Sequence, residues 1–371
     1  MRVLIAAGGT GGHVMPALEV ARELERRGAD LLFVGTSRGL ENRLVPERGY
    51  RLATVEVGAL KGMGVGRVVG TLLGLPAAFV RAARLIEEFG PDVAYGMGGY
   101  ASGPVLLMAA LKNIPVVVHE PNAVPGFANR LLAPWVARAL VAQEDALRFF
   151  PARRAEVVGV PVRREFFAIP PKTHEPPYTV LVTGGSQGSA RLNRAVKEAL
   201  PVLAGRKDLF LLHQTGPKEY EEVRKAYAEA RGEGEVVPFL EDMPAAMARA
   251  DLVVCRAGAV TLAELAAAGR AGLLVPFPHA ADQHQLRNAR ALERAEAARV
   301  VLDAELSGSR LLSEIDAMLP RLREMEVAVR GLAQPRAAER VVAVLEEVAG
   351  KAKGKTQNAK GKTGDTNTFA L

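Results

Sequence analysis

The chain has few or none of the features that mark several common classes of protein. Its single cysteine, Cys255, excludes an intramolecular disulfide, which suits a reducing cytoplasm. No apolar stretch approaches the ~20 residues that a bilayer-spanning helix needs. The N-terminal stretch before Gly8 is too short for a signal peptide. We therefore expect a cytoplasmic protein with no membrane-spanning segment.

Aromatic residues and concentrated positive charge are also scarce. Aromatic side chains make up 5% of the chain, and 48 Lys and Arg residues against 41 Asp and Glu residues leave a formal net charge of +7. Residues 351–371 hold five lysines and one aspartate, which account for +4 of that charge. Because nucleic-acid binding needs a concentrated basic surface with aromatic platforms or a known motif, we expect no nucleic-acid partner.

The two halves of the 371-residue chain begin in the same way. A short apolar strand at 3–7 runs into the turn Gly8-Gly9-Thr10-Gly11-Gly12-His13, and another at 180–183 runs into Gly184-Gly185-Ser186-Gln187-Gly188-Ser189. An amphipathic helical pattern follows each turn. Further apolar strands, alternating with helices, are expected at 31–34, 92–95, 115–118 and 139–142, and at 209–213, 235–237, 252–255 and 272–275. This alternation predicts an α/β protein with two Rossmann-like parallel-sheet domains that face a cleft.

Composition suggests where these domains begin and end. The first is expected over 1–160 and the second over 178–332, with a proline-rich hinge linker at 161–177. A final amphipathic helix is expected at 333–350, ended by Gly350. Residues 351–371 repeat Lys, Gly, Thr and Asn without apolar periodicity, which predicts a disordered tail.

The glycine turns are candidate anion-binding sites, because glycine permits close backbone approach and a helix N-terminus presents free N–H groups. They match neither common nucleotide fingerprint. Val14 stands where a dinucleotide motif has its last glycine, and Phe33-Val34-Gly35-Thr36 lacks the expected acidic ribose ligand. Gly188 is followed by Ser189-Ala190-Arg191 and not by a P-loop lysine. The alternative is that the glycines only make tight turns from strand to helix.

An acidic residue after another strand is a better candidate for binding a ribose. Glu264 follows the strand at 252–255 and is expected in the first turn of the next helix, where its carboxylate could accept two hydrogen bonds from a diol. The alternative is a capping box, because Thr261 and Glu264 have the Thr-x-x-Glu spacing. Phe239 and Leu240, after another strand, would offer an apolar wall and backbone groups to a base.

Taken in order, these motifs resemble the MurG family of glycosyltransferases. The resemblance extends over roughly residues 2–348 and is carried by Gly8-Gly9-Thr10-Gly11-Gly12-His13, Gly98-Gly99-Tyr100, His119-Glu120-Pro121-Asn122, Gly184-Gly185-Ser186-Gln187-Gly188 and Arg256-Ala257-Gly258-Ala259 to Glu264. It implies the GT-B fold, with a C-terminal helix that returns toward the first domain. It also implies an inverting transfer of N-acetylglucosamine from UDP-N-acetylglucosamine to the C4 hydroxyl of the muramoyl unit of undecaprenyl-linked lipid I, which forms lipid II in peptidoglycan synthesis.

The resemblance also implies roles for individual residues. Ser186 would meet a phosphate, Leu240 the uracil through its backbone, and Glu264 the ribose hydroxyls. The sugar or its phosphates would contact Gln285, Ala259, Val260, Thr261, Leu262 and Ala263, and the diphosphate would contact Arg163. The transferred sugar and the acceptor would be bordered by Thr10, Gly11, Gly12 and Asn122. Two positions depart from the family pattern: Pro121 stands where glutamine is usual, and Val160 where asparagine often precedes Pro-Val-Arg.

An inverting displacement needs a base for the acceptor hydroxyl and stabilisation of the leaving UDP. His13 is the best candidate base because imidazole titrates near neutral pH, and Glu120 is a competing or orienting carboxylate. The alternatives are that His13 caps its helix or hydrogen-bonds the acceptor, and that His119-Glu120 is a packing pair.

Leaving-group stabilisation is expected without a metal. The chain contains no Asp-x-Asp sequence, so Arg163 and helix N-termini are expected to stabilise UDP, with no cofactor required. The sequence His279-Ala280-Ala281-Asp282-Gln283-His284 lacks the further ligands that a metal site needs.

Residues 57–86 are expected to meet an anionic membrane surface. They contain Lys61, Arg67, Arg81 and Arg84 and no acidic residue, and the apolar run 68–80 could lie in the membrane interface but not span it. The alternative is an ordinary buried helix with solvated ends. Together with a membrane-bound acceptor, this stretch predicts a peripheral protein on the inner face of the cell membrane.

Other functions would share these features. A UDP-N-acetylglucosamine 2-epimerase, or a transferase with another lipid acceptor, would have the same architecture. A nucleotide-sugar-binding module without catalysis would fit the departures at Pro121 and Val160. Epimerisation of UDP-N-acetylglucosamine without an acceptor would favour the epimerase, and binding of the donor without turnover on lipid I would favour the binding module.

Overall fold

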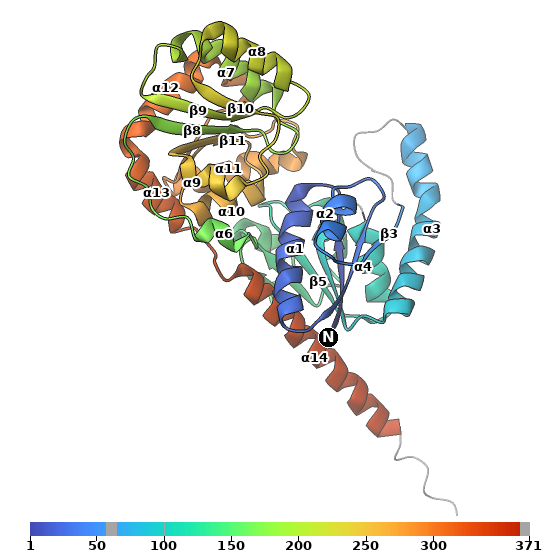
Figure 1. The fold of residues 1–371 in the computed structure, drawn as a ribbon. Coiled ribbons are helices and arrows are strands. Elements are labelled where there is room, and N and C mark those ends of the chain that lie inside the picture. The colour runs from blue at the N-terminus through green and yellow to red at the C-terminus, as the bar shows by residue number, and fades with distance from the viewer. Residues whose placement is uncertain (57–64, 100, 364–371) are drawn as a thin grey trace, which may run out of the picture. The chain divides into compact units, whose positions relative to one another are not determined.

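The computed structural model of the chain describes residues 1–56, 65–99 and 101–363, and the side chains of all of these except 65–74 and 355–363. The chain divides into two units, one formed by Met1–Pro161 together with the chain from Arg336 onward, the other by Val162–Pro335. Each unit contains a parallel sheet covered by helices (Figure 1). The predicted α/β class with two Rossmann-like domains is therefore confirmed.

In the described part of the first unit, seven parallel strands form a sheet in the order β3-β2-β1-β4-β5-β6-β7. The strands are β1 (Arg2–Ala7), β2 (Asp30–Gly35), β3 (Leu52–Thr54), β4 (Val93–Gly98), β5 (Val116–Glu120), β6 (Arg138–Val141) and β7 (Ala155–Val157). The interior strand β1 is apolar and buried from Val3 to Ala7, as expected for a parallel sheet covered on both faces. The two edge strands β3 and β7 were not predicted.

Helices of the first unit form two layers. They are α1 (Gly11–Arg26), α2 (Glu41–Glu47), α3 (Val65–Phe89), α4 (Ser102–Leu111), α5 (Phe127–Leu132) and α14 (Ala337–Thr363). Helices α1 and α14 contribute to one hydrophobic core with residues such as Leu18 and Leu345. Helices α3, α4 and α5 contribute to a second core with residues such as Ala82, Leu106 and Leu132. The sheet separates these two cores (Figure 1).

Helix α14 confirms the expected return of the C-terminal helix to the first domain. Glu346 and Glu347 form ion pairs with Arg27 and Arg138, at 2.8 Å and 3.3 Å. The predicted bounds were wrong, because the helix begins at Ala337 and continues past Gly350 to Thr363. The ion pair between Lys351 and Glu347, one helical turn apart at 2.6 Å, stabilises this continuation. The stretch predicted as a disordered tail is thus helical as far as Thr363, and residues 364–371 lie outside the described residues.

In the described part of the second unit, six parallel strands form a sheet in the order β10-β9-β8-β11-β12-β13. The strands are β8 (Tyr178–Thr183), β9 (Leu209–Gln214), β10 (Gly234–Val237), β11 (Leu252–Cys255), β12 (Ala271–Leu274) and β13 (Ala298–Val300). The edge strand β13 was not predicted. The strands that were predicted in both units lie within about one to three residues of their observed bounds, which is the usual accuracy for element ends.

Helices also cover both faces of the second sheet. They are α6 (Arg164–Phe167), α7 (Ala190–Leu203), α8 (Tyr220–Ala230), α9 (Met243–Arg249), α10 (Ala259–Ala268), α11 (His284–Arg294), α12 (Gly308–Met318) and α13 (Leu322–Arg330). Residues such as Val196 of α7 and Ile315 of α12 belong to one core. Residues such as Leu265 of α10 and Val329 of α13 belong to the other.

The proline-rich segment predicted as a hinge linker at 161–177 is instead bound to the second unit. The His174 imidazole lies between two buried carboxylates, with Nδ1 3.0 Å from Asp251 Oδ1 and Nε2 2.9 Å from Glu326 Oε2. These contacts join the segment to the residue before β11 and to α13, so it cannot move independently of the second sheet. The prediction of a linker of this length was wrong, and the chain passes between the units at Pro161–Val162.

Helix α3 contains most of the stretch that was expected to meet a membrane. Ala82 and Ile86 pack into the core, whereas Val80 is 53% exposed and Arg81 and Arg84 are exposed. The C-terminal half of α3 is thus an amphipathic helix against the first unit's sheet. Residues 57–64, which include Lys61, and the side chain of Arg67 lie outside the described residues. Within the described ranges, no helix combines the length and the apolar character needed to cross a bilayer.

Candidate functional site

Each sheet reverses its strand order at one point, and a ligand-binding crevice is expected there. In the first unit the chain leaves β1 for β2 on one side and later returns to β4 on the other side of β1. In the second unit it leaves β8 for β9 and returns to β11. Ligands of open α/β sheets bind at the carboxyl ends of strands, at this switch point. The glycine turns at 8–13 and 184–189 follow β1 and β8, so they lie at the two switch points.

In the first unit, the turn after β1 lies against the turn after β4. A Cβ atom on Gly99 would come within 2.4 Å of the Gly8 carbonyl oxygen. Gly98 and Gly99 have φ values of +93° and +91°, a conformation that glycine adopts at no steric cost. The close approach of these two turns therefore depends on glycine. Tyr100, which follows them, lies outside the described residues.

His13 lies in the first turn of α1, next to the Gly98 turn. Its Nδ1 is 3.4 Å from Thr10 Oγ1, and its Nε2 would be 3.4 Å from a Cβ atom on Gly98. The N-cap position of α1 belongs to Thr10, so the alternative that His13 caps the helix is wrong. Gly11 and Gly12 are the first residues of α1 and lie between Thr10 and His13. The imidazole is half-buried, so a ligand can reach it.

Glu120 holds the loop that follows β5. Its buried carboxylate accepts hydrogen bonds from the backbone N–H groups of Asn122 and Gly126 and from the side-chain amides of Asn122 and Asn129, at 2.9–3.0 Å. Pro121 has no N–H group, and none of these bonds uses that position. These four hydrogen bonds hold the backbone and the two asparagine side chains of the loop against the end of β5. This geometry favours the orienting role of Glu120 and places Asn122 under its control.

His119 is fully buried and makes two hydrogen bonds inside the first unit. Its Nε2 donates to the Gly159 carbonyl oxygen at 2.8 Å, so its Nδ1 accepts from the Tyr95 hydroxyl at 2.9 Å. Burial lowers the pKa of His119 to about 4, and the imidazole is therefore neutral near pH 7. His119 thus packs inside the first unit at the end of β5, which is the structural role that the sequence analysis gave as the alternative.

Two polar residues at this edge were missed by the sequence analysis. Glu41 is fully buried beside the turn at 8–10, and its Oε2 accepts the Gly9 N–H at 2.8 Å. Asn129 is 1% exposed, and its Oδ1 has no hydrogen-bond partner among the residues that the structure describes. Its Nδ2 would be 3.8 Å from a Cβ atom on Gly98, so Asn129 lies near His13. Neither residue stands in a recognisable motif, and only the fold brings them to the glycine turns.

In the second unit, polar side chains at the strand ends hold the turn after β8. The Thr183 hydroxyl donates to Gln214 Oε1 at 2.6 Å, and Gln214 Nε2 donates to the Gly185 carbonyl oxygen at 3.1 Å. Ser189 caps α7 through its side chain. Ser186 is exposed in this turn, so its hydroxyl is accessible to a phosphate.

Two glycines of this edge serve different purposes. A Cβ atom on Gly188 would lie 1.9 Å from the Thr215 carbonyl oxygen, so packing against the turn after β9 requires glycine there. Gly185 also has a positive φ, +81°, but a Cβ atom on it would meet nothing within 4 Å. The tight-turn alternative therefore accounts for Gly188, while the space beside Gly185 is open.

Glu264 lies in the second turn of α10, not in the first as predicted. The helix begins at Ala259 after the N-cap residue Gly258, and no described side chain caps it. The capping box of Thr261 and Glu264 is therefore wrong, because the helix begins before the position that this box requires. The N-terminal N–H groups of α10, over Ala259, Val260 and Thr261, are free to bind an anion. Leu262 is buried in the core, and Ala263 is half-buried beside Glu264.

Arg163 lies close enough to Glu264 to influence its ionisation. Burial raises the pKa of Glu264 to about 7, and the nearby Arg163 guanidinium opposes this rise. The Arg163 guanidinium also stacks over the Phe166 ring at 5.0 Å, and its buried Nε has no hydrogen-bond partner among the described residues. The structure thus brings a carboxylate and a guanidinium, 101 residues apart in sequence, to one place beside α10.

Leu240 and Gln285 come from two other loops of the second unit. Leu240 follows β10 and packs against the core that contains α10, while the preceding Phe239 is 44% exposed. Gln285 lies in the first turn of α11, and its Oε1 accepts the Phe277 N–H at 2.9 Å, which joins α11 to the loop after β12. Joint contact of Leu240, Gln285 and Ser186 with one ligand stays a prediction.

Two further features bear on metals and pockets. In the described ranges, no group of three or more His, Cys, Asp and Glu side chains is placed to hold a metal ion.

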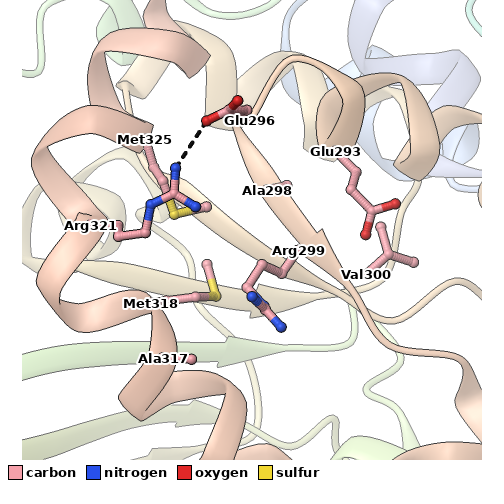
Figure 2. A pocket seen from close by; sticks show the side chains of 9 residues that line it. All are labelled: Glu293, Glu296, Ala298, Arg299, Val300, Ala317, Met318, Arg321 and Met325. Carbon is pink, nitrogen blue, oxygen red and sulfur yellow. Dashed lines mark hydrogen bonds and ion pairs between the residues drawn. The ribbon is translucent and has the colours of Figure 1, made fainter.

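A cavity of about 250 Å³ lies beside β13, with the ion pair of Arg321 and Glu296 (2.9 Å) in its wall (Figure 2). Its lining comes from α11, β13, α12 and α13, and includes none of the predicted site residues.

Comparisons with known sequences agree with this division into two domains. Residues 3–141 match the model of the glycosyltransferase family 28 N-terminal domain, and residues 179–355 match that of the family 28 C-terminal domain. The UDP-N-acetylglucosamine–N-acetylmuramyl-(pentapeptide) pyrophosphoryl-undecaprenol N-acetylglucosamine transferase of Solibacter usitatus is 49% identical over 347 residues, 93% of this chain and 96% of that protein. The protein of the same name from Myxococcus xanthus is 45% identical over 356 residues, 94% of this chain and 93% of that protein.

Solved structures give the same result. The crystal structure of Acinetobacter baumannii MurG matches with a TM-score of 0.76 and 32% identity, covering 93% of this chain and 99% of that one. A UDP-GlcNAc 2-epimerase from Neisseria meningitidis, bound to UDP-GlcNAc, matches with a TM-score of 0.66 but only 13% identity, covering 94% of this chain and 100% of that one. The likeness to the epimerase shows a shared fold alone.

Proposed function

The chain belongs to glycosyltransferase family 28, among the MurG enzymes, and on that premise we propose how its residues carry out the transfer. It is a glycosyltransferase of peptidoglycan synthesis, with UDP-N-acetylglucosamine as donor and lipid I as acceptor. We propose that it acts by a single inverting displacement, in which the C4 hydroxyl of the muramoyl unit attacks the anomeric carbon and UDP leaves. No covalent enzyme intermediate is needed in such a step.

The donor is held by the second unit, and the position of Arg163 near enough to Glu264 to influence its ionisation is the observation that carries this assignment. A half-buried carboxylate whose pKa is raised by loss of water gains most from hydrogen-bond donors, and a ribose diol supplies two of them. The Arg163 guanidinium and the uncapped N-terminus of α10 lie beside it and suit the diphosphate. In this arrangement the phosphate contacts Ser186, the uracil contacts Leu240 and the sugar contacts Gln285.

The acceptor is held by the first unit, and His13 removes the proton from the attacking hydroxyl. The imidazole is half-buried, and its Nδ1 lies 3.4 Å from the Thr10 hydroxyl. Its Nε2 lies on the side of Gly98, and we assign this nitrogen to the acceptor hydroxyl. General-base assistance of this kind typically contributes ~10²–10⁴-fold in rate. Asn122, held by Glu120, orients the sugar or the acceptor.

The leaving UDP is stabilised by fixed positive charge in the second unit. The Arg163 guanidinium provides a full charge, and the N-terminus of α10 provides the equivalent of roughly half a charge. Preorganised charge of this kind is most effective where water is excluded. We propose that no divalent metal or other cofactor is needed for the step.

The membrane-facing surface lies on the first unit, over the exposed parts of α3, α4 and α5. Large apolar side chains are exposed there, and basic side chains lie between them. The apolar residues are Val80, Leu111, Phe127, Leu131 and Trp135, each at least 47% exposed, and the exposed basic ones include Arg81, Arg84 and Arg130. Such a surface binds anionic lipid at ~1 kcal/mol per basic residue. The enzyme then works as a peripheral protein at the inner face of the membrane, with no nucleic-acid partner.

Transfer assays with purified substrates test the donor assignment. Glu264→Gln should weaken binding of UDP-N-acetylglucosamine at least tenfold, since the amide offers the diol one acceptor oxygen and no charge. Glu314→Gln is the matched control, because Glu314 is also a buried carboxylate of the second unit but forms its ion pairs with Arg299 and Arg310. Equal donor affinity in the two variants would remove the ribose assignment.

Vesicle binding tests the membrane surface. Charge reversal of Arg81 and Arg84 together should reduce binding to vesicles with anionic lipid while sparing turnover of a soluble lipid I analogue. Charge reversal of Arg224 and Lys225, two exposed basic residues of α8 in the second unit, is the control and should leave vesicle binding unchanged. The assignment of this surface is wrong if both pairs of substitutions reduce binding equally.

A further inference from the structure

A buried carboxylate lies under the first glycine turn, where no motif predicted one. Glu41 begins α2 and is fully buried. Its Oε2 accepts the Gly9 N–H at 2.8 Å, and its Oε1 accepts the N–H of Thr36 at 2.8 Å and the Thr36 hydroxyl at 3.0 Å. Burial of an ionised carboxylate is costly unless donors replace water. These three donors and the N-terminus of α2 serve that purpose here.

The chain makes room for this carboxylate with three glycines. A Cβ atom on Gly8, Gly35 or Gly39 would come within 2.5 Å, 2.5 Å or 1.9 Å of a Glu41 side-chain atom. The three glycines belong to the end of β1, the end of β2 and the turn before α2, so they reach the same carboxylate from separate segments. The Glu41 side chain therefore fills a space that all three glycines leave open.

Glu41 and the Leu40 backbone hold the Gly9 peptide from both sides. Its N–H is taken by Glu41, and its carbonyl oxygen lies 3.4 Å from the backbone nitrogen of Leu40, which donates to it. Gly9 has a φ of +91°, where the backbone has no side chain of its own to restrain it. Thr10 and His13 follow directly, and their side chains lie 3.4 Å apart. A shift of the Gly9 peptide would therefore move Thr10 and His13 together.

We propose that Glu41 is a positioning residue of the transfer reaction, which fixes the turn at 8–10 and through it the placement of the His13 imidazole. Glu41 does not touch the substrate, because it is buried beneath the turn. The inference rests on the proposed role of His13 in the acceptor half of the reaction. Because a displacement of about 1 Å at a reacting group can cost ~10²-fold in rate, a carboxylate under this turn controls turnover without taking part in the chemistry.

The test compares two buried carboxylates of the first unit, Glu41 beneath the turn that precedes α1 and Glu23 within α1. Glu41→Gln keeps the shape of the side chain but replaces one acceptor oxygen with an NH₂ group, which faces an N–H donor and cannot accept its hydrogen bond. Glu23→Gln is the control, because Glu23 is 3% exposed near the other end of α1 and pairs with Arg26 and Arg27. Both variants are assayed as full-length protein for kcat, for the KM of each substrate and for thermal unfolding.

We expect Glu41→Gln to lower kcat by roughly 10- to 100-fold while the affinity for UDP-N-acetylglucosamine stays within twofold of the parent enzyme. Glu23→Gln should change kcat by less than threefold at a comparable loss of stability. Hydrogen exchange at the Gly9 amide should accelerate in Glu41→Gln alone. If kcat and Gly9 exchange are unchanged in Glu41→Gln, or if Glu23→Gln lowers kcat equally, the proposal is overturned.

A double variant separates this proposal from the proposed role of His13. If Glu41 acts through His13, the effects of His13→Ala and Glu41→Gln on kcat should not add. The kcat of the double variant should then lie within about threefold of that of His13→Ala. Full additivity would show that Glu41 does not act through His13. Near-normal turnover of His13→Ala with slow Glu41→Gln would instead refute the base assignment and the route through it, and would leave Glu41 acting on the turn by itself.

Discussion

The raised pKa of Glu264 makes a quantitative prediction about the pH dependence of stability. In the folded enzyme this carboxyl keeps its proton up to a pKa of about 7, because burial disfavours its charge, against a usual value of 4.5. Between these two pH values the native state binds more protons than the unfolded state, so the free energy of unfolding falls as pH rises. The loss is complete above pH 7.

The size of this loss follows from the same values. The difference between about 7 and 4.5 corresponds to about 3 kcal/mol at 1.36 kcal/mol per pKa unit. Because Glu264 is only partly buried by surface area, water screens some of the effect, and we expect about 1–2 kcal/mol. Glu264→Gln has no such proton to lose, so its stability should fall less across this range and exceed that of the parent enzyme at pH 7.5.

The assay must report on the second unit. Trp135, the only tryptophan of the chain, belongs to the first unit and serves as an internal control for it. Hydrogen exchange of the amides of β8 and β11 reports on the second unit. Measured in urea at pH 5, 6, 7 and 8, it should show a steeper loss of stability with rising pH in the parent enzyme than in Glu264→Gln. Parallel pH profiles of the two proteins in these strands would refute a raised pKa at Glu264.

Donor binding gives a second measurement of the same ionisation. The ribose hydroxyls donate to the charged carboxylate, which is about one-tenth ionised at pH 6 and about nine-tenths at pH 8 if its pKa is about 7. The affinity for UDP-N-acetylglucosamine should therefore fall by up to about tenfold from pH 8 to pH 6 in the parent enzyme. Calorimetry should also detect proton release on binding near pH 7, and neither effect should appear in Glu264→Gln.

Three other predictions concern the glycine turns and side chains at the carboxyl ends of the strands in the two sheets. His13→Ala should lower kcat by ~10²-fold or more, and a loss under tenfold would reduce His13 to a positioning role. Turnover should survive a strong chelator, and a loss that added Mg²⁺ restores would refute metal-free stabilisation of UDP. Gly188→Ala should lower the free energy of unfolding of the second unit by several kcal/mol and abolish donor binding, because the new Cβ atom overlaps the Thr215 carbonyl oxygen. Gly185 has a similarly positive φ but open space beside it, so Gly185→Ala should lower the free energy of unfolding by only about 1 kcal/mol. Equal effects of the two alanine substitutions, measured by thermal unfolding, would contradict the packing argument.

Local sequence patterns predicted the interior of each sheet and missed its borders. Strands such as β1 and β11 are short runs of apolar residues bounded by glycine, because both faces of a central parallel strand are covered. The edge strands β3, β7 and β13 are three residues long and partly exposed, so they carry no such run. The end of α14 was misjudged because one glycine costs a helix only about 1 kcal/mol and need not end it, and the pair of Glu347 with Lys351 offsets part of that cost.

The sequence by itself determined that this protein has two nucleotide-binding folds, with glycine turns at the first strand of each, because these features depend on neighbouring residues and on hydrophobic periodicity. Only the tertiary structure decided what the polar residues around those turns do. It assigned Glu120 to its own loop, put Glu41 under Gly9, placed Arg163 near Glu264 and bound His174 to Asp251 and Glu326. Apart from the Glu120 loop, these arrangements bring together residues that are far apart in the chain, and a buried charge takes its role from whichever donors the fold brings to it.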